Sequence, residues 1–177
     1  MAILIAFYSR AGENYFGGTY RRVAVGNTEK AAEMLSRLTG GKLFKIEQAR
    51  PYSENYQTCI AEAKADLQKK ARPEVLNLPE NLDAYDEIYL GYPNYWGTMP
   101  MAVYTFLERY DFTGKTAVPF MTNGGWPGHV IKDMKAPCPG ADAVCEMQVK
   151  FDSNGGDRLE TPESKIEAWA QNVKALL

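Results

Sequence analysis

The chain has 177 residues and a hydrophobic fraction of 45%, which fit one globular domain, expected over residues 1–177. Its 20 basic and 22 acidic side chains leave a formal net charge of -2, too small to favour nucleic acid or an anionic membrane as the main partner. Its three cysteines form no CxxC pair, and no apolar run approaches about 20 residues, so we expect no disulfide framework, zinc site or membrane span, and a cytoplasmic location.

The first half of the chain alternates strand and helix patterns. Residues 2–7 form an apolar run without alternation, typical of a strand covered on both faces in a parallel sheet. After Asn27 the helical spacing of apolar residues predicts a helix that ends before Gly40, with an inward stripe of Ala31, Met34, Leu35 and Leu38. Residues 42–49 predict a strand. Residues 55–71 predict an amphipathic helix whose inward residues are Tyr56, Ile60, Ala63 and Leu67.

The second half continues this alternation. Strands are predicted over residues 85–93, 115–122 and 142–149, and helices over 102–110, near 127–135 and from Pro162 onward. The inward residues are Val103, Phe106, Leu107 and Tyr110 in the first of these helices and Ile166, Trp169, Ala170, Val173 and Leu176 in the last. Five strands alternating with helices predict an α/β fold with a doubly wound parallel sheet, whose ligands bind beyond the carboxyl ends of the strands.

The connection between the first strand and the first helix is unusually long. Loops of more than about 12 to 15 residues are uncommon unless they are functional or disordered. It offers Ser9 and then Gly26, Asn27 and Thr28 at the start of the helix, where unpaired N–H groups and the helix dipole favour an anion such as a phosphate. The alternative is that Asn27 or Thr28 only caps the helix and the glycines only turn the chain.

The loops after the third and fourth strands combine glycines with aromatic and short polar residues. In "GYPNYWGTMP", flat rings could stack on a planar heterocycle or cover the end of the sheet; we favour packing for Tyr92 and ligand contact for Trp96. In "TNGGWPG", Thr122, Asn123 and the backbone beyond them offer donors to a flat ligand, although this loop could also be a plain turn into a short helix. Together with the first loop, these segments favour one ligand site.

Nearly the whole chain resembles the flavodoxin family, in particular proteins whose first loop reads S-R-x-G-N-T. Here the motif appears as Ser9, Arg10 and Ala11, an inserted stretch, and then Gly26–Thr28. The segments "ARPYSENYQTCIAEAKADLQKKARPE", "GYPNYWGTMPMAVYTFLERYDFTGKT" and "PFMTNGG" are also similar to that group. The resemblance implies a five-stranded, flavodoxin-like sheet with helices on both faces that binds flavin mononucleotide (FMN), with the phosphate at the first loop and the isoalloxazine ring between the other two.

The resemblance also implies three groups of cofactor-binding residues. The phosphate would be held by Ser9, Arg10, Ala11, Asn27 and Thr28, with Gly26 shaping the turn. The ribityl chain and ring would contact Pro93, Asn94, Tyr95, Trp96 and Gly97. The opposite edge of the ring would be lined by Thr122, Asn123, Gly124 and Gly125 and covered by Trp126.

The inserted residues 12–25 depart from the family pattern and leave Glu13, Tyr15, Arg21 and Arg22 without an assigned role. We interpret this segment as an excursion between the two halves of one anion cradle, which covers the cofactor or meets a partner. Either arginine could reach the phosphate, although arginines on a loop are more commonly solvated.

The expected function is electron transfer through bound FMN, between a reductase and an acceptor enzyme. The alternative is an FMN-dependent NAD(P)H:quinone-type reductase on the same fold, and a flavin-free binding module is a third possibility. The absence of a GxGxxG fingerprint favours the carrier, although such reductases can bind both substrates in turn over the flavin. We expect no catalytic side chain and no metal, a surface or capping role for His129, and structural roles for Cys59, Cys138 and Cys145.

Overall fold

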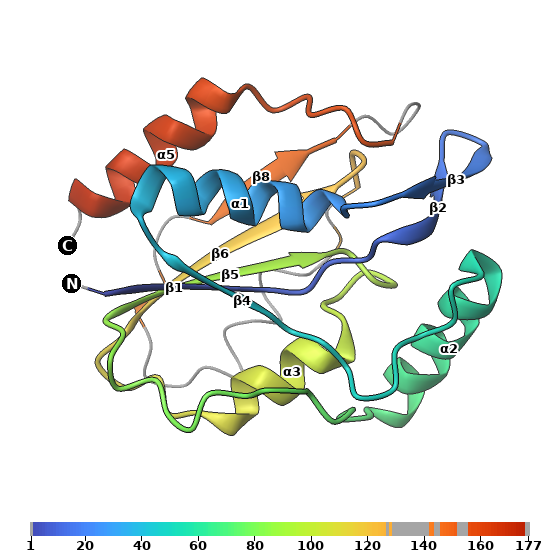
Figure 1. Ribbon diagram of the computed structural model, residues 1–177, viewed down its shortest axis with the longest axis horizontal. Coiled ribbons are helices and arrows are strands. Elements are labelled where there is room, and N and C mark those ends of the chain that lie inside the picture. The colour runs from blue at the N-terminus through green and yellow to red at the C-terminus, as the bar shows by residue number, and fades with distance from the viewer. Residues whose placement is uncertain (1, 127, 129–141, 144–145, 152–155, 176–177) are drawn as a thin grey trace.

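The central feature is a parallel β-sheet, seen edge-on in Figure 1. The computed structural model describes residues 2–126, 128, 142, 143, 146–151 and 156–175. The strands of the main sheet are β1 (Ile3–Phe7), β4 (Lys42–Lys45), β5 (Glu87–Pro93), β6 (Thr116–Asn123), β7 (Asp142–Ala143) and β8 (Met147–Lys150). The order is β4-β1-β5-β6-β7, and β8 also pairs with β6. This arrangement confirms the predicted α/β fold with a doubly wound parallel sheet.

The fifth strand position is shared by β7 and β8, which pair with successive parts of β6. Thr116 of β6 pairs with Asp142, whereas Phe120 pairs with Met147, so the register shifts by one residue between the two short strands. Both strands run parallel to β6. They agree with the single strand predicted over residues 142–149.

The sheet is buried on both faces, which explains why its central strands show no alternation in the sequence. Leu4 and Ala6 of β1 face a core shared with helix α3 (Met101–Arg109), whereas Ile5 and Phe7 face a core shared with helices α1 (Asn27–Thr39) and α5 (Glu163–Ala175). All four side chains are at most 3% exposed. The two hydrophobic cores therefore fix which side chains of each strand point to which layer of helices.

Helices cover both faces of the sheet, as Figure 1 shows. The first layer contains α1 (Asn27–Thr39) and α5 (Glu163–Ala175), and the opposite layer contains α3 (Met101–Arg109) with α2 (Tyr56–Lys69) beyond the strand ends. The buried residues are Thr28, Ala31, Ala32 and Leu35 in α1, Met101, Ala102, Val103, Phe106 and Leu107 in α3, and Ile166, Trp169, Ala170 and Val173 in α5. These buried residues agree with the predicted inward faces. The exceptions are Met34, Leu38 and Tyr110, which were predicted to face inward and are only half-buried. Leu176 and the predicted helix over 127–135, except Gly128, lie outside the described residues.

Helix α2 differs from its prediction. Its fully buried side chains are Cys59 and Ala63, whereas Tyr56, Ile60 and Leu67, which we expected to face inward, are only half-buried. The physical reason is its position: part of its apolar face lines a cavity beyond the sheet instead of packing on the strands.

The connection between β1 and α1 is a β-hairpin, so the prediction of a long loop there is wrong. Strands β2 (Gly12–Phe16) and β3 (Thr19–Val23) pair antiparallel as a two-stranded sheet of their own. Gly17 and Gly18 form the two-residue turn with φ of 55° and 99°. A primed hairpin turn requires a positive φ at both central positions, which glycine adopts without strain. The glycine pair therefore explains why the segment folds back here.

Candidate functional site

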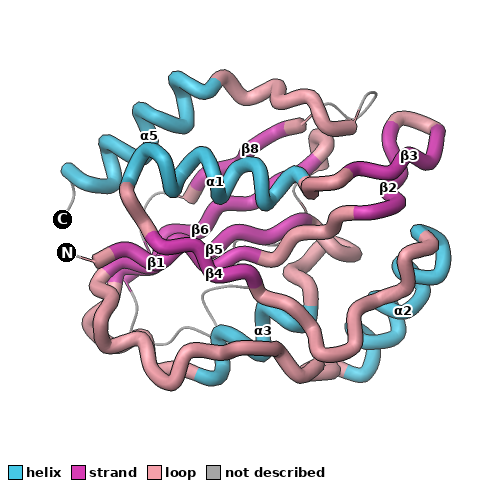
Figure 2. The backbone as a smooth tube through the Cα atoms, viewed as in Figure 1, coloured by secondary structure: helices cyan, strands magenta, loops and turns pink. Residues whose placement is uncertain are grey.

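A cavity of about 550 Å³ lies beyond the carboxyl ends of β1, β5 and β6. Beyond β1 the chain leads to α1 on one face of the sheet, and beyond β5 it leads to α3 on the other, so the strand order reverses at this point. Ligands of doubly wound sheets bind at such a switch point. Figure 2 shows the hairpin β2–β3 and helix α2 beyond the same end of the sheet. We refer to this space as the strand-end cavity.

The start of α1 forms one wall of the strand-end cavity. Ser9 Oγ accepts a hydrogen bond from the backbone N–H of Glu29 at 3.1 Å, so Ser9 caps the helix and keeps its own hydroxyl proton for another acceptor. The backbone N–H groups of Asn27 and Thr28, in the first turn, have no acceptor within the helix. These donors and the helix dipole favour an anion.

Gly26 allows the chain to pass close to the first loop. A Cβ atom on Gly26 would lie 2.8 Å from the carbonyl carbon of Arg10 and would also collide with Ser9 Oγ. Real Cβ atoms essentially never approach other heavy atoms so closely. The two halves of the interrupted motif, Ser9–Ala11 and Gly26–Thr28, therefore lie in contact although the hairpin separates them in the sequence.

Two buried hydroxyls join α1 to β6. Thr28 Oγ1 and Thr122 Oγ1 lie 2.7 Å apart, and the residues are 2% and 4% exposed. A pair of hydroxyls has two protons and uses one of them for this bond. Because both residues line the strand-end cavity, the second proton is available to a ligand there.

Two amide side chains in the cavity wall have unused polar atoms. Asn27 Nδ2 donates to the carbonyl of Gly156 at 2.7 Å, and Asn123 Oδ1 accepts from the N–H of Gly125 at 2.7 Å. Among the described residues, the remaining atoms Asn27 Oδ1 and Asn123 Nδ2 are buried and have no hydrogen-bond partner. A buried polar atom without a partner costs about 1–3 kcal/mol. Both amides thus fit a polar ligand that supplies the missing bonds.

The loop after β5 turns tightly around Trp96 and Gly97, with φ of 53° and 86°. Tyr95 and Thr98 exchange backbone hydrogen bonds of 2.8 and 3.1 Å across this turn. A positive φ is unfavourable for tryptophan, and backbone strain of this kind is concentrated at functional sites. The indole of Trp96 is 47% exposed, and its Nε1 donates to the carbonyl of Ile60 at 2.9 Å. The bond to α2 therefore holds a strained, half-exposed ring at the edge of the cavity.

Asn94 connects this loop to the loop after β6. Its Oδ1 accepts from the N–H of Gly97 at 2.8 Å, and its Nδ2 donates to the carbonyl of Trp126 at 2.8 Å. Trp126 is 69% exposed, and it lines the cavity together with Trp96. One amide therefore fixes the spacing of two loops whose aromatic side chains face the same space.

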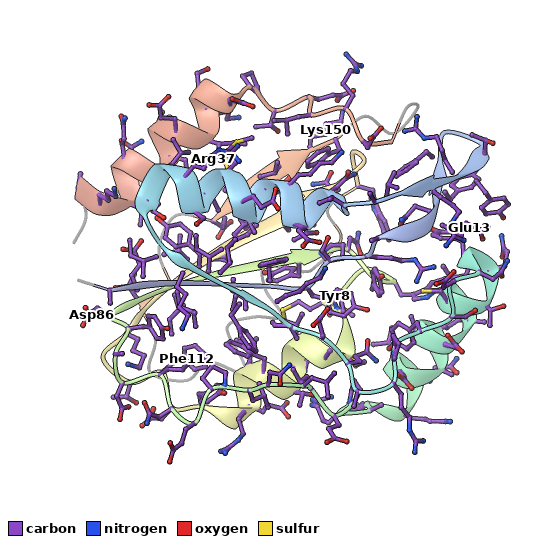
Figure 3. All side chains as sticks on the ribbon, in the orientation of Figure 1. Tyr8, Glu13, Arg37, Asp86, Phe112 and Lys150 are labelled. Atoms are coloured by element: carbon purple, nitrogen blue, oxygen red, sulfur yellow. The ribbon has the colours of Figure 1, made fainter. Side chains whose placement is uncertain are left out.

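The hairpin and α2 form a further part of the cavity wall. Glu13 accepts hydrogen bonds from the N–H of Tyr56 at 2.7 Å and from Asn55 Nδ2 at 3.3 Å, which joins β2 to the start of α2. Figure 3 shows Glu13 at this end of the molecule, far from Asp86. The rings of Tyr15 and Tyr56 stack with centroids 6.1 Å apart, and Tyr20 packs against both. We call these three residues the tyrosine wall.

The two arginines of β3 form ion pairs on opposite sides of the hairpin. Arg21 pairs with Asp157 at 2.5 Å, and Arg22 pairs with Glu54 at 2.8 Å. Lys30 also contacts Asp157, at 3.2 Å, and these two cations hold the pKa of that carboxyl below its ordinary value although its burial acts in the opposite direction. The hairpin is thus attached both to α2 and to the segment before α5.

Burial keeps one thiol and two phenol groups near the cavity neutral. It raises the pKa of the Cys59 thiol and of the Tyr8 and Tyr95 phenols. The Tyr8 hydroxyl donates to Gln48 Oε1 at 3.1 Å. These groups are therefore protonated at neutral pH and do not act as thiolate or phenolate bases. No group of three or more His, Cys, Asp or Glu in the described chain could hold a metal ion.

Most of the predicted site residues line the strand-end cavity. These are Ser9, Arg10, Gly26, Asn27, Thr28, Pro93, Asn94, Tyr95, Trp96, Thr122, Asn123, Gly124 and Trp126. Ala11, Gly97 and Gly125 do not line it. The Arg10 guanidinium is bound to the carbonyls of Glu13 and Glu54, so its contact with a phosphate stays a prediction. Tyr92 lies fully buried in the core, in agreement with the packing role favoured for it.

The sequence-based prediction missed the part of the wall formed by the hairpin and α2. It consists of Asn14, Tyr15, Phe16, Gly17 and Val23 from the hairpin and Tyr56, Cys59, Ile60 and Ala63 from α2. Phe151 and Gly156 were also missed. A Gly-Gly pair between residues of high β-propensity was the available signal for the hairpin. His129, Cys138 and Cys145 lie outside the described residues, and no described helix is long and apolar enough to cross a membrane.

Comparison with known proteins gives a family match. A family model described as flavodoxin matches residues 19–168, well over half of the chain. None of the curated proteins compared with the chain matches it. A solved structure of a candidate flavoprotein from Bacteroides eggerthii is 28% identical, with a TM-score of 0.73 and 98% of each chain covered.

Two more distant structures share the fold. A flavoprotein from Lactobacillus acidophilus in complex with FMN is 18% identical, with a TM-score of 0.65, and the match covers 96% of this chain and 98% of that one. Oxidised flavodoxin 2 from Bacillus cereus is 17% identical, with a TM-score of 0.58 and complete coverage of both chains. At these identities the likeness concerns the fold alone, which is the flavodoxin-like α/β fold.

Proposed function

The chain belongs to the flavodoxin family, and from this premise we propose that it binds FMN in the strand-end cavity and carries electrons between a reductase and an acceptor enzyme in the cytoplasm. The observation that carries the proposal is the pair of buried amide atoms without partners, Asn27 Oδ1 and Asn123 Nδ2, both from residues that line this cavity. The FMN bound to the Lactobacillus acidophilus flavoprotein supports the choice of cofactor.

The residues at the start of α1 fit the phosphate group. The free hydroxyl proton of Ser9, the first-turn N–H groups of Asn27 and Thr28 and the spare proton of the Thr28–Thr122 pair are donors to anionic oxygens. Gly26 lets the backbone approach without a side chain in the way. One helix dipole contributes only about 0.3–1 kcal/mol, so these converging donors must supply most of the affinity.

The two later loops fit the ribityl chain and the ring. The amide of Asn123 offers Nδ2 to a hydroxyl or carbonyl oxygen, and Trp96 and Trp126 offer flat apolar surfaces. Asn94 keeps the two loops at a fixed distance, so both can contact one planar ligand. When bound, the isoalloxazine ring accepts and releases one or two electrons, and the protein contributes stacking, hydrogen bonds and exclusion of water.

The proposal is tested by loading the purified protein with FMN and with riboflavin and measuring both affinities by calorimetry. We expect a yellow complex and an affinity for FMN about 100-fold or more above that for riboflavin, because only FMN has the phosphate. Asn27→Ala should weaken FMN binding about tenfold, whereas the exposed Asn172→Ala, in α5, should leave it unchanged. Equal affinities for the two flavins would refute the phosphate site.

A reductase on the same fold is the second candidate function, and the extent of the cavity favours it. The cavity reaches beyond the three strand-end loops to the hairpin and α2, whose residues form part of its lining. Anaerobic addition of NADH or NADPH to the FMN complex separates the two functions. Rapid loss of the flavin absorbance supports the reductase, and reduction that requires a separate reductase protein supports the carrier.

A further inference from the structure

We infer that the hairpin β2–β3 is a gate of the strand-end cavity, fastened to the segment Gly156–Asp157 beside the start of α1. We call the contact of Phe16 and Arg21 with this segment the clasp. The gate controls how fast a phosphate-bearing ligand enters and leaves, and the choice of FMN as that ligand rests on the proposed function. The contacts that form the clasp do not depend on the identity of the ligand.

The polar part of the clasp centres on Asp157. Its Oδ1 pairs with Arg21 of β3 at 2.5 Å, and its Oδ2 pairs with Lys30 of α1 at 3.2 Å. The three side chains are 36–47% exposed, so water and salt weaken both ion pairs. Asp157 therefore links the hairpin to α1 through a contact that can break and re-form readily.

The apolar part of the clasp is the contact between Phe16 and Gly156. A Cβ atom on Gly156 would lie 1.8 Å from Cγ of Phe16, so only glycine lets the backbone pass this ring. Gly156 also has a φ of 87°, which residues with a side chain rarely adopt. The guanidinium carbon of Arg21 lies over the same ring, 5.0 Å from its centroid. The ion pair and the ring contact thus hold the hairpin at one place.

The clasp is joined directly to the donors expected to hold the phosphate. Asn27 Nδ2 donates to the carbonyl of Gly156 at 2.7 Å, and Asn27 is the first residue of α1. Phe16, Asn27 and Gly156 all line the strand-end cavity. A ligand at the start of α1 would therefore lie next to the clasp, and separation of Phe16 from Gly156 would open the cavity wall at this point.

The hairpin is held more firmly on its other side, next to α2. Glu13 accepts hydrogen bonds from the N–H of Tyr56 and from Asn55 Nδ2, and the three rings of the tyrosine wall pack together. No strand pairing joins the hairpin to the central sheet in the described part of the chain. We therefore expect the hairpin to stay with α2 when the clasp opens, as a gate with one firm and one weak side.

The kinetic test measures association and dissociation of FMN by stopped-flow fluorescence. Asp157→Asn removes the charge that pairs with Arg21, and an exposed ion pair shifts an equilibrium about 1.5- to 5-fold. Both rate constants should rise by about this factor, while the dissociation constant should change less than about twofold, because a gate affects passage in both directions. Loss of a binding contact would instead change mainly the dissociation rate.

The charge of Asp157 by itself predicts the opposite sign. Removing a carboxylate near a phosphate dianion favours the bound state, so without a clasp Asp157→Asn should slow dissociation. Glu160→Gln is the matched control, because Glu160 belongs to the same segment but pairs with Lys150 of β8 at 2.8 Å instead of with the hairpin. It also does not line the cavity. This variant loses the same charge and should accelerate neither step.

A second measurement tests the clasp in the absence of FMN. Chymotrypsin cleaves after aromatic residues, and cleavage after Phe16 or Tyr20 requires local opening of the hairpin. The rate follows the population of open molecules when closing is faster than cleavage. Asp157→Asn and Arg21→Gln should each raise this rate about 1.5- to 5-fold, with the cleavage site identified by mass spectrometry. The double variant should show little further increase, because both changes remove the same ion pair.

Faster cleavage together with faster association and dissociation of FMN supports the gate. The inference is overturned if Asp157→Asn fails to accelerate hairpin cleavage or FMN association, or if Glu160→Gln has the same effect. A wild-type protein that takes up no FMN refutes instead the proposed function, and the cleavage rates then decide whether the clasp holds the hairpin.

Discussion

The hydroxyl pair between Thr28 and Thr122 allows a quantitative test of how α1 is joined to the sheet. Replacing either residue by valine keeps the shape of the side chain but leaves the other hydroxyl buried without its partner, at 2–4% exposure. Such a group costs about 1–3 kcal/mol, so each single variant should lose that much stability. Replacing both threonines removes both hydroxyls together, and the double variant should therefore lose less than about 1 kcal/mol.

The assay is equilibrium unfolding in urea of the four proteins without cofactor. With a slope of about 2 kcal/mol per molar urea, each single variant should shift the midpoint downward by about 0.5–1.5 M. Circular dichroism and tryptophan fluorescence must give coincident transitions, so that two-state energies apply. Thr19→Val, on the exposed edge of the hairpin, is the control and should stay within about 0.5 kcal/mol of the wild type. If the stability loss of the double variant equalled the sum of the two single losses, the two hydroxyls would not be hydrogen-bonded partners.

Three further outcomes follow from the structure. Gly26→Ala should weaken FMN binding and lower the urea midpoint of unfolding, because the new Cβ atom would collide with the carbonyl group of Arg10. Titration with FMN and urea unfolding measure the two effects. Wild-type values in both assays would contradict the close approach of Gly26 to Arg10. Trp96→Leu should weaken FMN binding about 2- to 12-fold by loss of stacking, as measured by calorimetry; unchanged affinity would exclude this ring as a stacking partner. Burial raises the pKa of Glu87, so the folded chain holds this proton more tightly than the unfolded chain and loses stability as pH rises from about 4.3 through the raised value. Glu87→Gln should flatten this loss and be the more stable protein at neutral pH, as followed by urea midpoints across pH; a parallel pH dependence in both proteins would contradict the assignment.

The central sheet was predictable because its strands are buried on both faces. The runs around Ile5, Tyr89 and Val118 are continuously apolar, and between them lie helices with clear apolar stripes. Local residue pattern and tertiary burial agree in these segments, so the order of elements follows from the sequence alone. The cavity residues at the strand ends follow from the same topology, since parallel strands bring their carboxyl ends to one edge.

The hairpin and the position of α2 were harder to foresee for a physical reason. Tyr15 and Tyr20 are about half exposed, so the hairpin has no strongly buried face to produce a hydrophobic pattern. The burial of Cys59 rather than Tyr56 in α2 depends on contacts with the hairpin and the cavity, which are distant in the sequence. The local residue pattern of one sequence carries little information about contacts between segments that are so far apart in the chain.

The hairpin belongs to a two-stranded sheet that shares no strand pairing with the central sheet in the described part of the chain. Its detachment would break surface ion pairs such as Arg21–Asp157 and the Glu13 bonds, while every hydrogen bond of the central sheet stays intact. Such a segment is a candidate for sub-global opening at a far lower free energy than complete unfolding. Amide hydrogens of β2 and β3 should then exchange with solvent much sooner than those of β5. A ligand of the strand-end cavity could enter and leave through this local opening while the central sheet stays folded.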